Sequence, residues 1–180
     1  MRPYAALLRG IAPSGPNMTN DKLRGVFEQL GFADVASVLS SGNIVFRSAI
    51  SDVPALEQRI EEALARDLGV SSRTIIRARP ELRGLVDSDP FPGETHGGST
   101  YLTASFLKHP ATALDVPEGL DPGTRVVRYD ASARAVLAIT DNSGSGRAQG
   151  FMAWLDRAFG KDVTTRSWLT VTRIVTLLEA

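Results

Sequence analysis

The side chains best suited to chemistry in this chain are hydrogen-bond donors of the kind that bind anions. Arg9 comes at the end of an apolar run, and Ser40, Ser41 and Asn43 lie in a short polar connection around Gly42. Guanidinium, hydroxyl and amide donors bind phosphate and carboxylate groups, and a helix N-terminus adds backbone N–H groups and a partial positive charge. These residue types therefore predict a site for a small anionic or nucleotide-like ligand, provided that the fold brings them together.

The residues of other common reaction centres are absent or differently spaced. The chain has no cysteine, which excludes disulfides, thiolate metal sites and cysteine nucleophiles. We interpret the two histidines, His96 and His109, as loop residues at the surface rather than as metal ligands. The glycines at residues 93–99 and 143–147 lack the Lys-Ser or Lys-Thr ending of a phosphate loop. We therefore name no catalytic residue, no metal ligand and no cofactor, and leave open whether the chain is an enzyme.

The polar connection around Gly42 is predicted to be the turn of a β-hairpin. Apolar runs at residues 35–39 and 44–46 flank it, and a Gly-Asn pair tolerates the positive φ that tight hairpin turns need. The other elements expected in the first half are a strand at residues 3–8, a helix capped by Thr19 or Asn20 and ended by Gly31, a helix capped by Ser51 and ended by Gly69, and a strand at residues 73–79. The order βαββαβ is typical of a ferredoxin-like sheet.

The second helix of this half carries several charged residues. We interpret Glu57, Glu61, Glu62 and Arg66 as its solvent-exposed face, with pairs of charges four residues apart.

The second half is predicted to be a looser copy of the first. A short helix at residues 80–86 and a turn-rich segment at residues 87–99 lead into strands at residues 101–107, 124–128, 133–140 and 163–165, a helix at residues 151–159, and a last helix from Ser167 or Trp168 to Leu178. We therefore expect an α+β protein of two ferredoxin-like repeats (split βαβ, or alpha-beta plait) with an extra C-terminal helix. The halves are residues 1–89 and 90–180, as two domains or as one compact unit.

The expected topology brings the anion-binding residues to one sheet edge. In a split βαββαβ sheet the first two strands run in the same direction, with the third antiparallel between them. Arg9 and Gly10 should therefore lie beside the hairpin turn, where the first helix also begins. The alternative is that Gly42 and Asn43 only form the turn, while Arg9 pairs with a nearby carboxylate or caps carbonyl groups.

Three separated motifs resemble those of one bacterial family. They are LLRGI at residues 7–11, LSSGNIVF at residues 39–46 and TRSWLTV at residues 165–171. In this respect the chain resembles the domain of unknown function 1697 family, whose members read roughly LLRGINVGG, QSGNVVF and TRNWNTV at these places. The resemblance covers essentially the whole chain and implies a pair of ferredoxin-like repeats, without an established activity.

The chain departs from the family pattern next to two of these motifs. Residues 12–16 read APSGP where the family tends to have Asn-Val-Gly-Gly-Lys, and Ser167 and Leu169 stand where asparagines are frequent. If the family binds a ligand there, this chain should bind it more weakly or bind another. The candidate binding residues are Arg9, Gly10, Asn17, Ser40, Ser41, Gly42, Asn43, Arg166 and Trp168, the last two as a contribution from the second half.

Charge and hydropathy narrow the expected partners. Twenty basic residues balance twenty acidic ones, and Tyr4 and Phe46 are the only aromatics expected on the central strands, which argues against single-stranded nucleic acid as the ligand. Such binding, or a role as a partner-binding or assembly module without a ligand, remains the alternative function. The apolar run at residues 4–8 is too short for a signal peptide or a membrane span. We therefore expect a cytoplasmic protein without membrane contact, as a monomer or small homo-oligomer.

Overall fold

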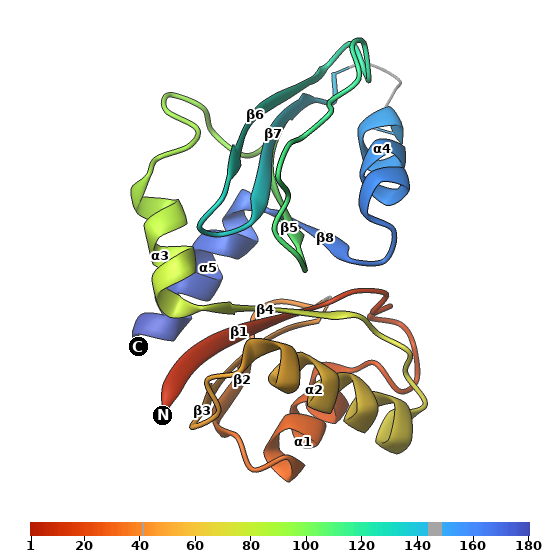
Figure 1. The fold of residues 1–180 in the computed structure, drawn as a ribbon, viewed down its shortest axis with the longest axis vertical. Coiled ribbons are helices and arrows are strands. Elements are labelled where there is room, and N and C mark those ends of the chain that lie inside the picture. Colours follow the sequence, from red (N-terminus) through yellow and green to blue (C-terminus); the bar gives the residue numbers. More distant parts are fainter. Residues whose placement is uncertain (41, 144–148) are drawn as a thin grey trace. The chain divides into compact units, whose positions relative to one another are not determined.

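The computed structural model describes residues 1–40, 42–143 and 149–180 (Figure 1). The strands are β1 (Arg2–Leu8), β2 (Ala33–Ser37), β3 (Asn43–Ser48), β4 (Thr74–Ala78), β5 (Thr100–Leu107), β6 (Thr124–Asp130), β7 (Ala135–Asp141) and β8 (Val163–Ser167). The helices are α1 (Asn20–Gln29), α2 (Val53–Leu68), α3 (Arg79–Asp87), α4 (Gln149–Phe159) and α5 (Trp168–Glu179). The predicted α+β class is confirmed.

Two compact units make up the chain. One comprises Met1–Pro80 together with Arg173–Ala180, and the other comprises Glu81–Thr172. Compactness does not say which segments fold independently, so the boundary expected between residues 89 and 90 stays a prediction.

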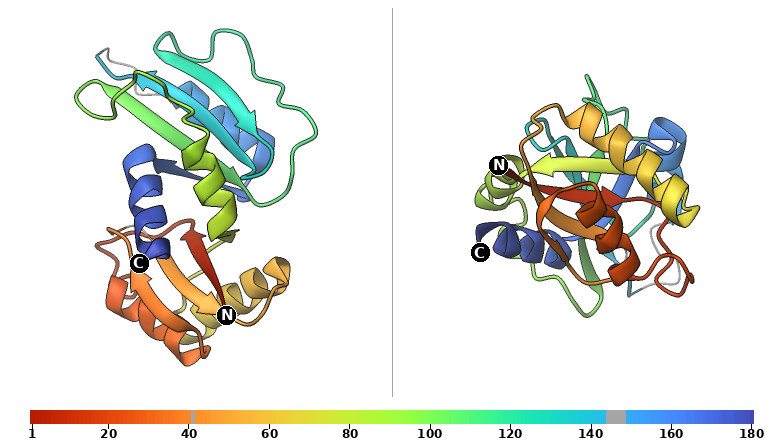
Figure 2. Two further views of the ribbon diagram at one scale, coloured as in Figure 1. Left: turned by 90° about the vertical axis from the view of Figure 1, so that its left-hand side faces the viewer. Right: turned by 90° about the horizontal axis from the view of Figure 1, so that it is seen from below.

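The first unit contains the predicted ferredoxin-like sheet. Its strand order is β2-β3-β1-β4, and each neighbouring pair is antiparallel. Helices α1 and α2 lie together on one face of this sheet, as Figures 1 and 2 show. Between the helices and the sheet lies an apolar core in which Tyr4, Phe27 and Phe32 gather around Phe46. The alternation of β1 explains this, because Tyr4, Ala6 and Leu8 all face the helices.

Local signals fix the ends of these two helices. The Thr19 side chain accepts a hydrogen bond from the backbone N–H of Lys22, and Gly31, just after α1, has φ +79°. Helix α2 is capped by Asp52, whose carboxylate accepts from the N–H of Ala55 at 3.1 Å. The predicted Ser51 cap is therefore wrong by one residue, and a carboxylate is the favourable charge at this end of a helix.

The interpretation of Glu57 and Glu61 as solvent-exposed is wrong. Glu57 is only 4% exposed and accepts a hydrogen bond from the N–H of Ile76 at 2.9 Å. Glu61 accepts one from the N–H of Thr74 at 2.8 Å. Strand β4 is an edge strand, so α2 places these two carboxylates along the backbone that no neighbouring strand covers.

Replacing Glu57 by alanine should lower the free energy of unfolding by about 1–3 kcal/mol, because the buried N–H of Ile76 loses its acceptor. Glu62 is a matched control, because it is exposed and accepts a hydrogen bond from Gln58 at 2.8 Å. Its replacement by alanine should lower the free energy of unfolding by less than about 0.5 kcal/mol. Urea unfolding followed by circular dichroism measures both. Equal losses for the two variants would contradict this role for Glu57.

The second unit repeats the same sheet with one helix fewer. Its strand order, β6-β7-β5-β8, corresponds strand for strand to that of the first sheet, and all pairs are antiparallel. Helix α4 covers one face through Phe151, Trp154 and Leu155. Residues 108–123 connect β5 to β6 without a helix. Together with α5 at the end of the chain, this arrangement confirms the predicted pair of repeats with a C-terminal helix.

Candidate functional site

The end of β1 and the hairpin turn meet at one edge of the first sheet. Leu7 pairs with Asn43, and the N–H of Leu8 donates to the carbonyl of Gly42 at 2.8 Å. We call this edge the loop rim and define it as residues 9–22, 38–40 and 42–43. The antiparallel pairing of β1 with β3 thus brings Arg9, which follows Leu8, next to the turn.

The backbone of Arg9 is fixed between two strands. Its N–H donates to the carbonyl of Arg73 at 2.8 Å, and its carbonyl accepts from the hydroxyl of Ser72 at 2.8 Å. Arg73 itself pairs with Glu61 at 3.3 Å. Gly10 follows with φ +79° and is exposed. The side chains of Arg9 and Arg73 therefore start from backbone positions that lie opposite each other at this edge of the sheet. Arg9 follows β1, and Arg73 precedes β4.

The first turn of α1 is tied to the hairpin. The side-chain amide of Asn20 donates to the carbonyl of Leu39 at 2.8 Å. Within the described part of the chain, the backbone N–H groups of Asn20 and Asp21 have no acceptor, as is usual for the first helical residues. The carboxylate of Asp21 is bound by Arg24. The helix therefore contributes free donors to the loop rim, and the acidic residue of its first turn, Asp21, is already paired with Arg24.

Lys22 is a further cation of the loop rim that the sequence analysis missed. Its ammonium group donates to the carbonyl of Pro16 and to the side-chain oxygen of Asn17, each at 2.9 Å. The amide of Asn17 in turn donates to the carbonyl of Leu68 at 3.1 Å. An ammonium group has three donors, so one is left. Only the fold of the loop places Lys22 there, since it looks like any solvent-exposed lysine in the sequence.

The hairpin residues differ in how accessible they are. Asn43 is 2% exposed, and its side-chain amide donates to the carbonyl of Val38 at 3.1 Å, which closes the turn. Gly42 is also buried, with φ +75°. Ser40 is exposed, whereas Ser41 lies outside the described residues. Of the described polar residues of the turn, Ser40 is therefore the one whose side chain is open to a ligand.

Arg166 and Trp168 belong to the second unit. Arg166 donates to the hydroxyl of Thr164 at 2.7 Å and to the carbonyl of Thr165 at 3.0 Å. Burial disfavours its charged form and lowers the pKa of Arg166 to about 10, so the side chain stays a cation at neutral pH. Trp168 packs edge-to-face against Phe91, with 5.2 Å between ring centres. Their contribution to ligand binding stays a prediction.

Two kinds of feature are missing from residues 1–40, 42–143 and 149–180. They contain no group of three or more His, Cys, Asp or Glu side chains that could hold a metal ion. No helix among them combines the length and the apolar character needed to cross a membrane.

Comparisons with known proteins give a family and a fold. A family described as protein of unknown function (DUF1697) matches residues 1–134. The chain is similar in structure to a conserved bacterial protein from Streptococcus pneumoniae, with a TM-score of 0.70 and 20% identity over 98% of both chains. At this identity the likeness shows the fold alone. No curated protein matches the chain.

Proposed function

Because the chain belongs to the DUF1697 family of proteins of unknown function, we propose a function from the geometry of the loop rim: it binds a small anionic ligand such as a phosphate or a nucleotide. The observation that carries this proposal is the hydrogen bond from the N–H of Leu8 to the carbonyl of Gly42 at 2.8 Å. This bond joins the end of β1 to the hairpin turn, beside which α1 begins.

The donors around this bond suit an anion. Arg9 and Lys22 supply positive charge, while the first N–H groups of α1 and the hydroxyl of Ser40 supply further hydrogen bonds. Hydrogen bonds from charged donors are shorter and stronger than neutral ones, and the helix dipole adds to them. These groups are hydrogen-bond donors and cations rather than acceptors, so they favour an anionic ligand.

The proposal predicts that inorganic phosphate and adenosine monophosphate bind at the loop rim, whereas adenosine, which lacks the charge, does not. In a nitrogen-15 NMR titration, the backbone amides of Gly10, Asn20 and Asp21 should shift with both anions. A ligand at a hundred times its dissociation constant should also stabilise the fold by about 2.7 kcal/mol. Substituting Lys22→Gln should weaken phosphate binding about tenfold, as expected when a charged donor is lost.

Lys161→Gln is the matched control, because Lys161 is an exposed lysine of the second unit. It should leave phosphate binding unchanged. Shifts confined to other amides, or equal weakening by both lysine variants, would contradict the site. An absence of shifts with either anion would contradict the function.

A further inference from the structure

In the first repeat, helix α2 supplies hydrogen-bond acceptors for the outer edge of strand β4. Glu57 accepts from the N–H of Ile76 at 2.9 Å, and Glu61 accepts from the N–H of Thr74 at 2.8 Å. Glu57 is only 4% exposed, so its carboxylate is buried against the strand. The first repeat therefore shows which group fits the outward N–H groups of the last strand, and that group is a carboxylate.

The corresponding strand of the second repeat is β8. The N–H of Lys108 donates to the carbonyl of Asp162 at 2.8 Å, and the register continues without a shift to Ser167, which pairs with Thr103. Because hydrogen-bonded and non-hydrogen-bonded pairs alternate in an antiparallel ladder, the N–H groups of Thr165 and Ser167 point away from β5. Within the described part of the chain, neither N–H has an acceptor. We call the outward side of residues 163–167 the β8 edge.

Helices α2 and α4 carry buried residues at the same spacing. In α2 these are Leu56 and Ile60, and each directly precedes one of the two glutamates. In α4 they are Phe151 and Leu155, and the residue after Phe151 is Met152. The position that holds the buried carboxylate in the first repeat therefore holds a methionine in the second, and a thioether is only a weak acceptor.

The β8 edge is open and carries a positive charge near Thr165. Met152 is 41% exposed, in contrast to its buried counterpart in α2. The guanidinium group of Arg166 donates to the carbonyl of Thr165 at 3.0 Å, which places the cation at this edge. Two acidic residues, Asp162 and, by its position in α4, Asp156, belong to the start of β8. The outward N–H groups near its end are therefore closer to a cation than to these carboxylates.

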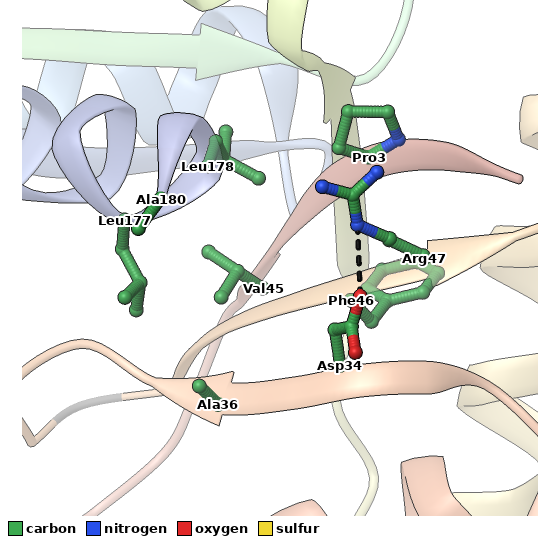
Figure 3. Close-up of a pocket in the computed structure, with 9 residues that line it drawn as sticks. All are labelled: Pro3, Asp34, Ala36, Val45, Phe46, Arg47, Leu177, Leu178 and Ala180. Carbon is green, nitrogen blue, oxygen red and sulfur yellow. Dashed lines mark ion pairs between the residues drawn. The ribbon is translucent and has the colours of Figure 1, made fainter.

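The other edge strands are protected by irregular pairing. Strand β2 has a register shift, and its Asp34 is paired with Arg47 at 2.9 Å, as Figure 3 shows. Strand β6 has a register shift between Val126 and Arg128. Such irregularities keep an edge strand from binding a further group along its backbone. The register of β8 is regular, so its outward N–H groups stay aligned for an acceptor.

We propose that the β8 edge binds a small aliphatic carboxylate, independently of the function proposed for the loop rim. One oxygen accepts from the N–H of Thr165, as the carboxylate of α2 does in the first repeat, and the hydrocarbon part lies along Met152. Hydrogen bonds from a backbone N–H to a carboxylate are among the stronger ones in proteins. An added peptide strand fits less well, because it needs open carbonyl groups too, and that of Thr165 is bonded to Arg166.

Butyrate and butyramide test this site, since they share the hydrocarbon chain and differ in charge. In a nitrogen-15 NMR titration at constant ionic strength, butyrate should shift the backbone amides of Thr165 and Ser167. Butyramide should bind about tenfold more weakly, because it lacks the charged acceptor. The loop-rim substitution Lys22→Gln should leave the butyrate shifts unchanged, which separates this site from the one proposed for phosphate.

The substitution Met152→Glu restores in α4 the carboxylate of the first repeat. Its side chain should occupy the site, so the butyrate shifts at Thr165 and Ser167 should disappear. Ala153→Glu is the matched control, because this exposed neighbour adds the same charge on another face of the helix and should leave butyrate binding unchanged.

Four results would overturn the proposal. Loss of the butyrate shifts in both glutamate variants would show a general effect of charge. Equal binding of butyrate and butyramide would show apolar contact alone. Shifts that persist in Met152→Glu would place butyrate elsewhere, and an absence of shifts at Thr165 and Ser167 would show that water suffices at this edge.

Discussion

Replacing Phe46 by alanine is expected to lower the free energy of unfolding by about 4 kcal/mol, the cost of removing a large aromatic side chain from a packed core. Phe46 is 1% exposed. Its ring lies 4.7 Å from that of Phe32, 5.4 Å from that of Phe27 and 5.7 Å from that of Tyr4, measured between ring centres. One substitution therefore removes contacts to strand β1, to helix α1 and to the segment after it.

The substitution Phe46→Leu provides the matched comparison. It keeps most of the apolar volume but loses the ring contacts, so we expect a loss of about 1–1.5 kcal/mol. Urea unfolding with circular dichroism gives both values, and the slope of the transition shows whether both variants expose the same surface. A loss below about 1 kcal/mol for the alanine variant would show that the four rings do not act as one core.

The first half could be predicted closely because its signals are local. Helix α1 needs only a capping threonine, an apolar stripe and a glycine after its end, and all three are adjacent in the chain. The strand order then follows from the sequence of elements, since few topologies connect βαββαβ without crossing loops. The structure confirms that order in the first sheet, β2-β3-β1-β4.

How closely the two halves resemble each other becomes clear from the strand register. Arg77 pairs with Ala5 in the first sheet, and Arg166 pairs with Ala104 at the corresponding place in the second. In both halves the last strand then runs directly into a helix, α3 or α5. The apolar spacing of α3 and α5 is the same, with Leu82, Leu85 and Val86 in one and Val171, Ile174 and Val175 in the other, and the strand register shows which residues correspond.

The errors concern side chains whose surroundings come from elsewhere in the chain. Glu57 flanks the apolar stripe of α2 and looks exposed until β4 is placed beside it. Lys22 looks like any solvent-exposed helix residue in the sequence, whereas in the structure its ammonium group is bonded to residues 16 and 17. A helix pattern shows which face is apolar, but not which polar residue at its border meets a backbone group. For the same reason, local sequence patterns do not identify the ligand of the loop rim.

Replacing Gly42 by alanine should destabilise the first unit by about 3 kcal/mol and also disturb the loop rim. A residue with a side chain at φ +75° costs about 1–2 kcal/mol. A Cβ atom here would in addition lie 2.7 Å from Cγ1 of Ile11 and 2.9 Å from Cβ of Leu8, and forcing extra volume into a packed site costs about 1–3 kcal/mol. Relief of these contacts must shift Ile11 or move the turn away from β1, and moving the turn would strain the bond from Leu8 to the carbonyl of Gly42.

Gly10→Ala separates the two causes. Gly10 has φ +79°, but no atom lies within 4 Å of where its Cβ would be, so only the conformational cost of about 1–2 kcal/mol applies. Urea unfolding should therefore show a loss about 1–3 kcal/mol larger for Gly42→Ala than for Gly10→Ala. Equal losses of unfolding free energy in the two variants would mean that the turn accommodates a Cβ atom at residue 42 without strain. If Gly42→Ala loses more unfolding free energy than Gly10→Ala and also weakens the phosphate shifts at Asn20 and Asp21 more, ligand binding depends on the close packing of turn and strand.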